Sequence, residues 1–140
     1  MRVMVLVKAT RDSEAGAMPS TELLAAMTRF NEELVQAGIL VSGDGLHPSS
    51  KGKRVVFEGQ SRTLIDGPFE AIEELVAGFW VWQVKDMAEA VSWAQRCPNP
   101  MPDGGVLEIR PLLEAADFGE VLTPEMAETH ARLRERQATR

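Results

Sequence analysis

Cysteine is almost absent from this sequence, because Cys97 stands alone among 140 residues. A single cysteine cannot close a disulfide within the chain, which excludes the small domains that depend on disulfides for their stability. A lone thiol fits a reducing compartment, and we expect a cytoplasmic protein. With 44% hydrophobic residues, a chain of this length has enough apolar material for one domain with its own core.

Positive charge is also in short supply. The sequence has 15 Lys and Arg against 21 Asp and Glu, which gives a formal net charge of -6. This sign disfavours a protein whose main partner is the phosphate backbone of a nucleic acid. The apolar start of the chain, residues 1–8, is too short for a secretory signal or a membrane span, and no small-residue cleavage site follows it. We therefore expect neither a nucleic-acid partner nor a membrane partner.

Residue types that bind metals or nucleotides form no recognisable motif. His47 and His130 are far apart in the sequence, and no pair of histidine and cysteine has the spacing of metal ligands. No glycine-rich loop of either nucleotide-binding type is present. Cys97 ends a predicted helix, where the helix dipole disfavours a thiolate, so it is a poor nucleophile. We expect no metal and no cofactor.

Apolar spacing predicts an alternation of strands and helices. In residues 2–8, valines occupy one face while Met4 and Leu6 occupy the other, so this strand needs cover on both faces. Further strands are predicted at residues 39–41, 54–57, 63–65, 79–84 and 106–110. Helices are predicted to begin at the caps Ser20, Asp86 and Thr123, and a short helical segment is predicted at residues 69–77. Residues 42–52 are rich in glycine and serine and predict a loop.

This order predicts an α+β fold with a ferredoxin-like antiparallel sheet, two helices on one face and a strand pair inserted in the middle. Residues 1–111 form the expected domain, and residues 112–140 form a C-terminal extension with one helix. The second face of the sheet stays apolar, and nothing left in the chain is predicted to cover it. A second copy packed face to face about a twofold axis would do so, and we therefore expect a homodimer.

The tetrapeptide Asp66-Gly67-Pro68-Phe69 carries a family resemblance. Together with residues 30–38, 43–50, 78–85, 90–98, 107–111 and 117–125, it makes the chain similar to the YCII-related proteins, specifically the DGPF branch. The resemblance implies a dimeric α+β barrel and supplies no established reaction. Related barrels host small-molecule enzymes such as monooxygenases and muconolactone isomerases, and DGPF genes often lie beside genes for extracytoplasmic-function sigma factors.

The sequence departs from its relatives at two points. Asp44 stands where DGPF relatives usually have glutamate, which shortens any acid there by one methylene. The shorter YCII proteins carry a catalytic His and Asp pair, with the histidine on the first long helix. The corresponding predicted helix contains no histidine, so this pair is not transferred.

Asp44, His47 and Ser50 are the leading candidates for chemistry. A carboxylate that orients an imidazole is the minimum apparatus for acid-base work near neutral pH. The alternative is a turn in which the aspartate and serine bond to local backbone and His47 is exposed.

Asp66 and two tryptophans complete the candidate set. Asp66 either caps a turn through its backbone bonds or faces the barrel interior near Asp44, where a second carboxylate would raise one pKa. Trp80 and Trp82 share one face of a predicted strand. They either stack on a flat ligand or belong to the core and the dimer interface.

Two functional hypotheses follow from these residues. The first is a protein that binds or transforms a small organic molecule in the barrel, by acid-base chemistry or by oxidation of an aromatic or enol-like substrate. It predicts a cavity of ligand size with at least two of the polar candidates converging on it. The alternative is a non-catalytic regulatory dimer linked to a sigma-factor pathway, which predicts a filled interior and loss of partner binding when the chain is truncated after Pro111.

Overall fold

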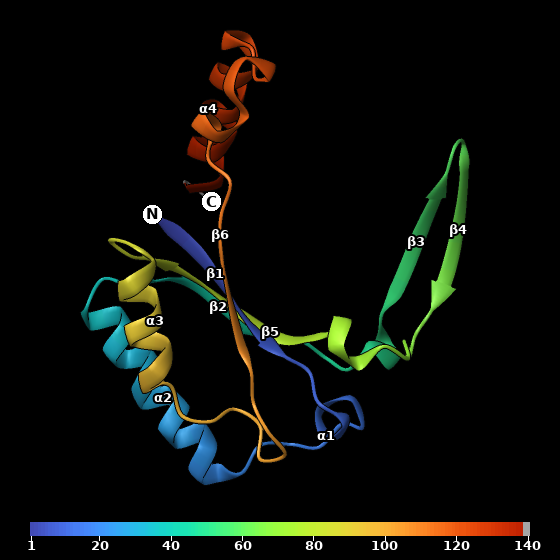
Figure 1. Ribbon diagram of the computed structural model, residues 1–140, viewed down its shortest axis with the longest axis vertical. Coiled ribbons are helices and arrows are strands. Elements are labelled where there is room, and N and C mark those ends of the chain that lie inside the picture. The colour runs from blue at the N-terminus through green and yellow to red at the C-terminus, as the bar shows by residue number, and fades with distance from the viewer. Residues whose placement is uncertain (139–140) are drawn as a thin grey trace.

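The computed structural model describes residues 1–138, and the last two residues of the expected C-terminal extension lie outside the described part. An antiparallel sheet of four strands carries two helices on one face, while a hairpin and a C-terminal helix project from this body (Figure 1). The strands are β1 (Arg2–Lys8), β2 (Leu40–Gly45), β3 (Lys53–Glu58), β4 (Ser61–Asp66), β5 (Val76–Gln83) and β6 (Leu107–Pro111). The α-helices are α1 (Arg11–Glu14), α2 (Thr21–Gln36), α3 (Met87–Arg96) and α4 (Pro124–Ala138).

The four-stranded sheet has the order β2-β5-β1-β6, with antiparallel pairing throughout. In this order β1 and β5 are central, and α2 and α3 connect the strands across one face. This is the ferredoxin-like arrangement, with β3 and β4 inserted between β2 and β5 as a separate two-stranded unit. The predicted α+β fold with a C-terminal helix is therefore confirmed.

The core lies between the sheet and the two long helices. Val3 and Val5 of β1 are fully buried on the helix-facing side, and Val3 pairs with Trp82 of β5. Phe30 and Leu34 of α2 close over these side chains. Each fully buried large side chain contributes about 1.5–3 kcal/mol by leaving water, so this face is the main source of stability.

The long helices begin and end where their sequences predict. The Ser20 hydroxyl accepts a hydrogen bond of 3.0 Å from the Leu23 amide at the start of α2. After α2, Gly38 adopts a positive φ of 74°, which glycine accommodates without strain. At the start of α3, the Asp86 carboxylate accepts a bond of 2.9 Å from the Glu89 amide.

Two local predictions are wrong, and one short helix was missed. Residues 42–45 continue β2 instead of forming a loop, because Gly43 makes room for a side chain of β5 and remains in register opposite Trp80. Residues 69–77 do not form a helix, since only the 3₁₀ turn Ile72–Glu74 is helical and Val76 already belongs to β5. The short helix α1 was not predicted, because four residues are too few for a periodic apolar pattern.

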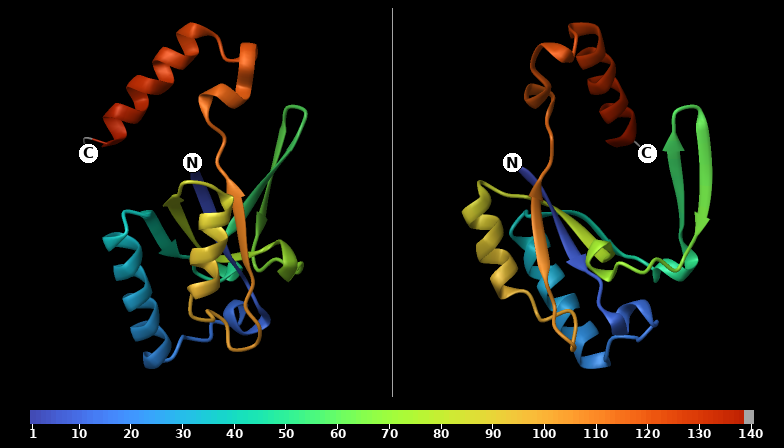
Figure 2. Two further views of the ribbon diagram at one scale, coloured as in Figure 1. Left: turned by 60° about the vertical axis from the view of Figure 1, so that its left-hand side comes forward. Right: turned by 45° about the vertical axis from the view of Figure 1, so that its right-hand side comes forward.

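The second face of the sheet carries Met4, Leu6, Phe79 and Val81, which alternate with the buried core residues and are partly exposed. Neither α2 nor α3 covers this face (Figure 2). The hairpin β3–β4 and the segment that follows β6 both project from the body in the same views. Among residues 1–138, no helix combines the length and the apolar character that crossing a bilayer requires.

Candidate functional site

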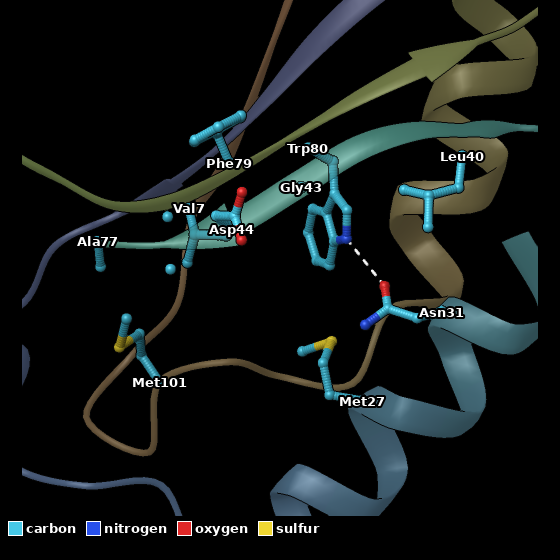
Figure 3. A pocket seen from close by; sticks show the side chains of 12 residues that line it. Val7, Met27, Asn31, Leu40, Gly43, Asp44, Ala77, Phe79, Trp80 and Met101 are labelled. Atoms are coloured by element: carbon cyan, nitrogen blue, oxygen red, sulfur yellow. Dashed lines mark hydrogen bonds between the residues drawn. The ribbon is translucent and has the colours of Figure 1, made fainter. Parts of the chain in front are cut away.

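A cleft lies where the ends of β2 and β5 meet α2 and the loop before β6 (Figure 3). Its inner cavity has a volume of about 350 Å³, and an adjoining outer cavity has about 490 Å³. The two cavities share Gly45, Ala77 and Met101, so we treat them as one, the β2–β5 cleft. The inner cavity is lined by Val7, Met27, Asn31, Leu40, Gly43, Asp44, Gly45, Ala77, Gly78, Phe79, Trp80 and Met101.

Most of the inner wall is apolar and adaptable. In the close-up view Met27 of α2 lies below Trp80, and Met101 of the loop lies farther along the cleft, below Ala77 (Figure 3). Methionine thioethers are flexible and make favourable contacts with aromatic rings. A wall of this composition suits the flat apolar body of a small ligand.

Trp80 is held in one orientation by α2. Its indole Nε1 donates a hydrogen bond of 2.9 Å to Oδ1 of Asn31. Phe30 packs edge-on against the same indole, with ring centroids 5.9 Å apart. The side chain is only 7% exposed, so it borders the cleft with one edge. Trp80 is therefore a preorganised wall of the cleft.

Two polar side chains on the cleft have no partner within the described chain. Asp44 lies on β2 opposite Phe79 and lines the inner cavity. His47 lies just beyond the end of β2 and lines the outer cavity. No residue among 1–138 forms a hydrogen bond or ion pair with either side chain, so both are available to a ligand.

The other predicted site residues do not reach this cleft. Ser50 is exposed in the 3₁₀ turn Ser49–Lys51. Asp66 lies at the end of β4, where its carboxylate accepts a hydrogen bond of 2.6 Å from Lys53 and remains 72% exposed. The interpretation that Asp66 faces an interior near Asp44 is therefore wrong, because the hairpin register places Lys53 opposite it.

Trp82 is also unavailable to a ligand in the described chain. Its side chain is 0% exposed and packs against Phe30, with ring centroids 6.3 Å apart. The predicted stacking role is wrong for this residue, because its strand face lies under the two long helices. Its indole Nε1 is buried without an acceptor among the described residues.

The motif that carries the family resemblance builds the base of the hairpin. The Gly67 amide donates a bond of 3.0 Å to the Gly52 carbonyl, and the Phe69 amide donates a bond of 3.0 Å to the Ser49 hydroxyl. A Cβ at Gly67 would lie 1.7 Å from the Ser49 carbonyl oxygen, so only glycine fits. Ser49 in turn donates through both its amide and its hydroxyl to the Glu14 carboxylate.

Sequence reasoning missed Asn31, Glu14 and Met101. Asn31 follows the core residue Phe30 on α2, and a polar residue beside the apolar stripe was the available signal. Glu14 lies in the unpredicted helix α1, and Met101 lies between two prolines in a loop without a periodic pattern. The contacts of these residues join segments far apart in the sequence, which explains why local patterns did not find them.

Electrostatics adds two constraints. Burial raises the pKa of Cys97 to about 11, which keeps its thiol protonated near neutral pH. A hydrogen bond from Arg2 lowers the pKa of the Glu114 carboxyl below its usual value. Within residues 1–138, no three residues of the metal-ligating types gather closely enough to hold a metal ion.

The chain has relatives both in sequence and in structure. The chain is 27% identical over 86 residues to an uncharacterized protein of Rhizobium meliloti (strain 1021), covering 61% of this chain and 69% of that protein. A structural match is 5-chloro-2-hydroxyhydroquinone dehydrochlorinase from Burkholderia phenoliruptrix AC1100, solved with 2,5-dihydroxybenzoquinone. It has a TM-score of 0.47 and 14% identity, covering 84% of this chain and 98% of that one. The model of the YCII-related domain matches residues 1–116, and the chain therefore belongs to the YCII-related domain family.

Proposed function

We propose that this protein binds a small organic molecule in the β2–β5 cleft and that its working form is a homodimer. One observation supports this proposal above the others. Asp44, whose side chain has no hydrogen bond or ion pair in the described chain, lines an apolar cavity of ligand size, and the same cavity is bordered by Trp80, whose indole Asn31 holds in place. Ligand sites typically combine an apolar cavity of roughly 300–1,000 Å³ with a few polar groups of this kind.

The lining indicates the class of ligand. Met27, Met101 and Trp80 favour a flat apolar or aromatic body. Asp44 accepts hydrogen bonds, so the ligand should carry a hydroxyl or amine donor at one edge. A hydrogen bond to a charged acceptor is worth about 1.5–3 kcal/mol, which makes this contact the main source of selectivity. Phenols and enols are the simplest molecules with both properties.

Acid-base chemistry is the reaction class that these side chains support. Asp44 would accept the hydrogen bond of a phenol or enol hydroxyl, which favours loss of that proton. His47, in the adjoining outer cavity, carries an imidazole, the side chain that most often serves in general acid-base catalysis. The geometry assigns no nucleophile to the cleft, so we propose no covalent step.

The uncovered face of the sheet supports the dimer. Met4, Leu6, Phe79 and Val81 form an apolar row that a second copy would bury about a twofold axis. Asp44 pairs with Phe79 in the register of β2 and β5, so it lies at the edge of the same face. In the dimer the cleft would therefore open beside the interface, where the partner limits the access of water to Asp44.

A ligand titration tests the proposed function. The chain has three tryptophans and no tyrosine, so its intrinsic fluorescence comes from tryptophan alone. Phenol should quench this emission saturably. Anisole lacks the hydrogen-bond donor and cyclohexanol lacks the flat ring, so each should bind at least about tenfold more weakly than phenol. Calorimetry of the same titrations checks that the quenching reports binding.

Substitution of the acid supplies the matched control. Asp44→Asn should weaken phenol binding by about tenfold or more and leave anisole unchanged, because only phenol donates to the carboxylate. Asp66→Asn removes an exposed carboxylate outside the cleft and should change neither titration. Equal binding of phenol and anisole, or equal effects of the two substitutions, would refute the role of Asp44. The alternative hypothesis, a regulatory dimer in a sigma-factor pathway, predicts no saturable binding of any of these compounds.

A further inference from the structure

The hairpin β3–β4 exposes one apolar face. Its register pairs Val55 with Leu64 and Phe57 with Arg62 on this face. Val55 is 52% exposed, Leu64 is 61% exposed and Phe57 is 67% exposed. A two-stranded hairpin on its own is at best marginally stable in water. The hairpin therefore has the composition of an element that packs against a surface outside its own chain.

The segment after β6 has the same property. It comprises residues 112–138, which we call the C-terminal arm, and α4 has no buried residue. Its large exposed apolar side chains are Leu113, Phe118, Val121, Met126 and Leu133. One ion pair ties its start to the sheet, with 3.1 Å between the Arg2 guanidinium and the Glu114 carboxylate. The arm thus presents a second apolar surface without cover.

The two elements carry opposite charge. Residues 51–66, which span the hairpin and its base, contain four basic and two acidic residues, a net charge of +2. Residues 114–128 of the arm contain five acidic residues and no basic residue, a net charge of -5. Complementary charge steers association and fixes register between surfaces that also bury apolar side chains. Residues 114–128 of the arm therefore complement the hairpin in charge as well as in apolar character, whereas residues 129–138 carry a net charge of +2.

Their placement shows how they could meet. Figure 1 shows the hairpin and the arm rising from separate parts of the body, with the space next to the uncovered sheet face between them. A second copy seated on that face would lie between the two elements. In a twofold assembly each contact occurs twice. An arm of one copy that contacts the hairpin of the second is therefore matched by the arm of the second copy on the hairpin of the first.

We propose that the hairpin β3–β4 of one copy packs against the C-terminal arm of a second copy, in a reciprocal exchange within the homodimer. The proposal rests on the dimer of the proposed function and adds the elements that clamp it. Phe57 and Leu64 supply the apolar anchors on the hairpin, and the acidic first part of the arm faces the basic hairpin.

Photo-crosslinking in the full-length protein tests the exchange. Benzoylphenylalanine replaces Phe57 in one sample and Val91, an exposed apolar position on α3, in a control sample. Each protein is mixed with an isotope-labelled, unsubstituted copy, and cross-linked peptides are identified by mass spectrometry. The hairpin probe should join residues 112–138 of the labelled copy, and the α3 probe should not. Links that remain within one copy, or links to another surface of the partner, would overturn the exchange.

Sedimentation measurements supply an independent test. The double substitution Phe57→Ser and Leu64→Ser should raise the dimer dissociation constant at least about tenfold, because interface anchors of this kind commonly contribute that much. Val91→Ser should leave it unchanged, and circular dichroism checks that both variants fold. An unchanged dissociation constant in the double variant would refute the anchors, and a wild-type monomer would refute the dimer itself. The phenol titration of wild type separates these outcomes from failure of the cleft.

Discussion

Gly43→Ala provides a direct test of the packing beside the cleft. A methyl carbon at this position would lie 2.6 Å from Cδ1 of Trp80 and 3.1 Å from the Phe79 carbonyl oxygen. Non-bonded carbon atoms prefer separations of about 3.5–4.0 Å, so the indole or β2 must move by roughly 1 Å. Glycine at this position therefore reflects a close approach of β2 to a side chain of β5.

The indole has little freedom to move. Its Nε1 is bonded to Asn31 at 2.9 Å, and its ring packs against Phe30 and against Trp82 with centroid distances of 5.9 and 5.6 Å. Overpacking a site of this kind usually costs about 1–3 kcal/mol. We expect Gly43→Ala to lower the free energy of unfolding by that amount.

Gly45→Ala is the matched control, because Gly45 lies in the same strand and a Cβ there meets nothing within 4 Å. Urea denaturation followed by tryptophan emission measures both variants. Gly45→Ala should change the free energy of unfolding by no more than about 0.5–1 kcal/mol. Alanine also restricts the unfolded chain more than glycine does, which favours the folded state. Gly43→Ala should also weaken phenol binding through displacement of Trp80. Equal stability of the two variants would refute the reasoning.

Two further predictions concern groups outside the cleft. The pKa of Cys97 is about 11, against an ordinary 9.0, so little of its thiol is deprotonated at pH 8. Because the thiolate is the reactive form, Cys97 should react with iodoacetamide at pH 8 about a hundredfold more slowly than a free thiol, and its rate should rise about tenfold per pH unit. A rate equal to that of a small thiol would show that the side chain is not buried. Glu14→Ala should destabilise the protein by about 1–3 kcal/mol in urea, since Ser49 loses its acceptor, whereas Asp12→Ala on the same helix should have little effect.

Periodic elements were predictable because their signals are local. Ser20 and Gly38 bound α2, and the apolar spacing between them places Phe30 and Leu34 in the core. Gly43 was misinterpreted as part of a loop, because its neighbour Trp80 lies far along the sequence. A glycine that admits a distant side chain cannot be distinguished, from the sequence alone, from a glycine that permits a turn.

The candidate site was only partly predictable for the same reason. Asp44 and His47 were selected as a carboxylate and an imidazole close together in sequence, and the structure places both on one cleft. Asp66 was grouped with them as a second carboxylate that could face the barrel interior, but the register of the hairpin pairs it with Lys53 in solvent. Asn31, which orients Trp80, acts across 49 positions, so its polar position beside the apolar stripe of α2 did not by itself identify its partner.

The cleft and the proposed dimer contact are adjacent along the chain. Gly43 and Asp44 are consecutive in β2, so they lie on opposite faces of the sheet. Gly43 faces the helices and makes room for Trp80, and Asp44 lies at the edge of the uncovered face. Only residues 46–48 separate the end of β2 from the turn that begins at Ser49, where Gly67 and Phe69 close the base of the hairpin. His47 belongs to this short connection. A hairpin docked on a second copy would fix this connection and so limit the movement of His47 beside the cleft, which would couple the cleft to the dimer.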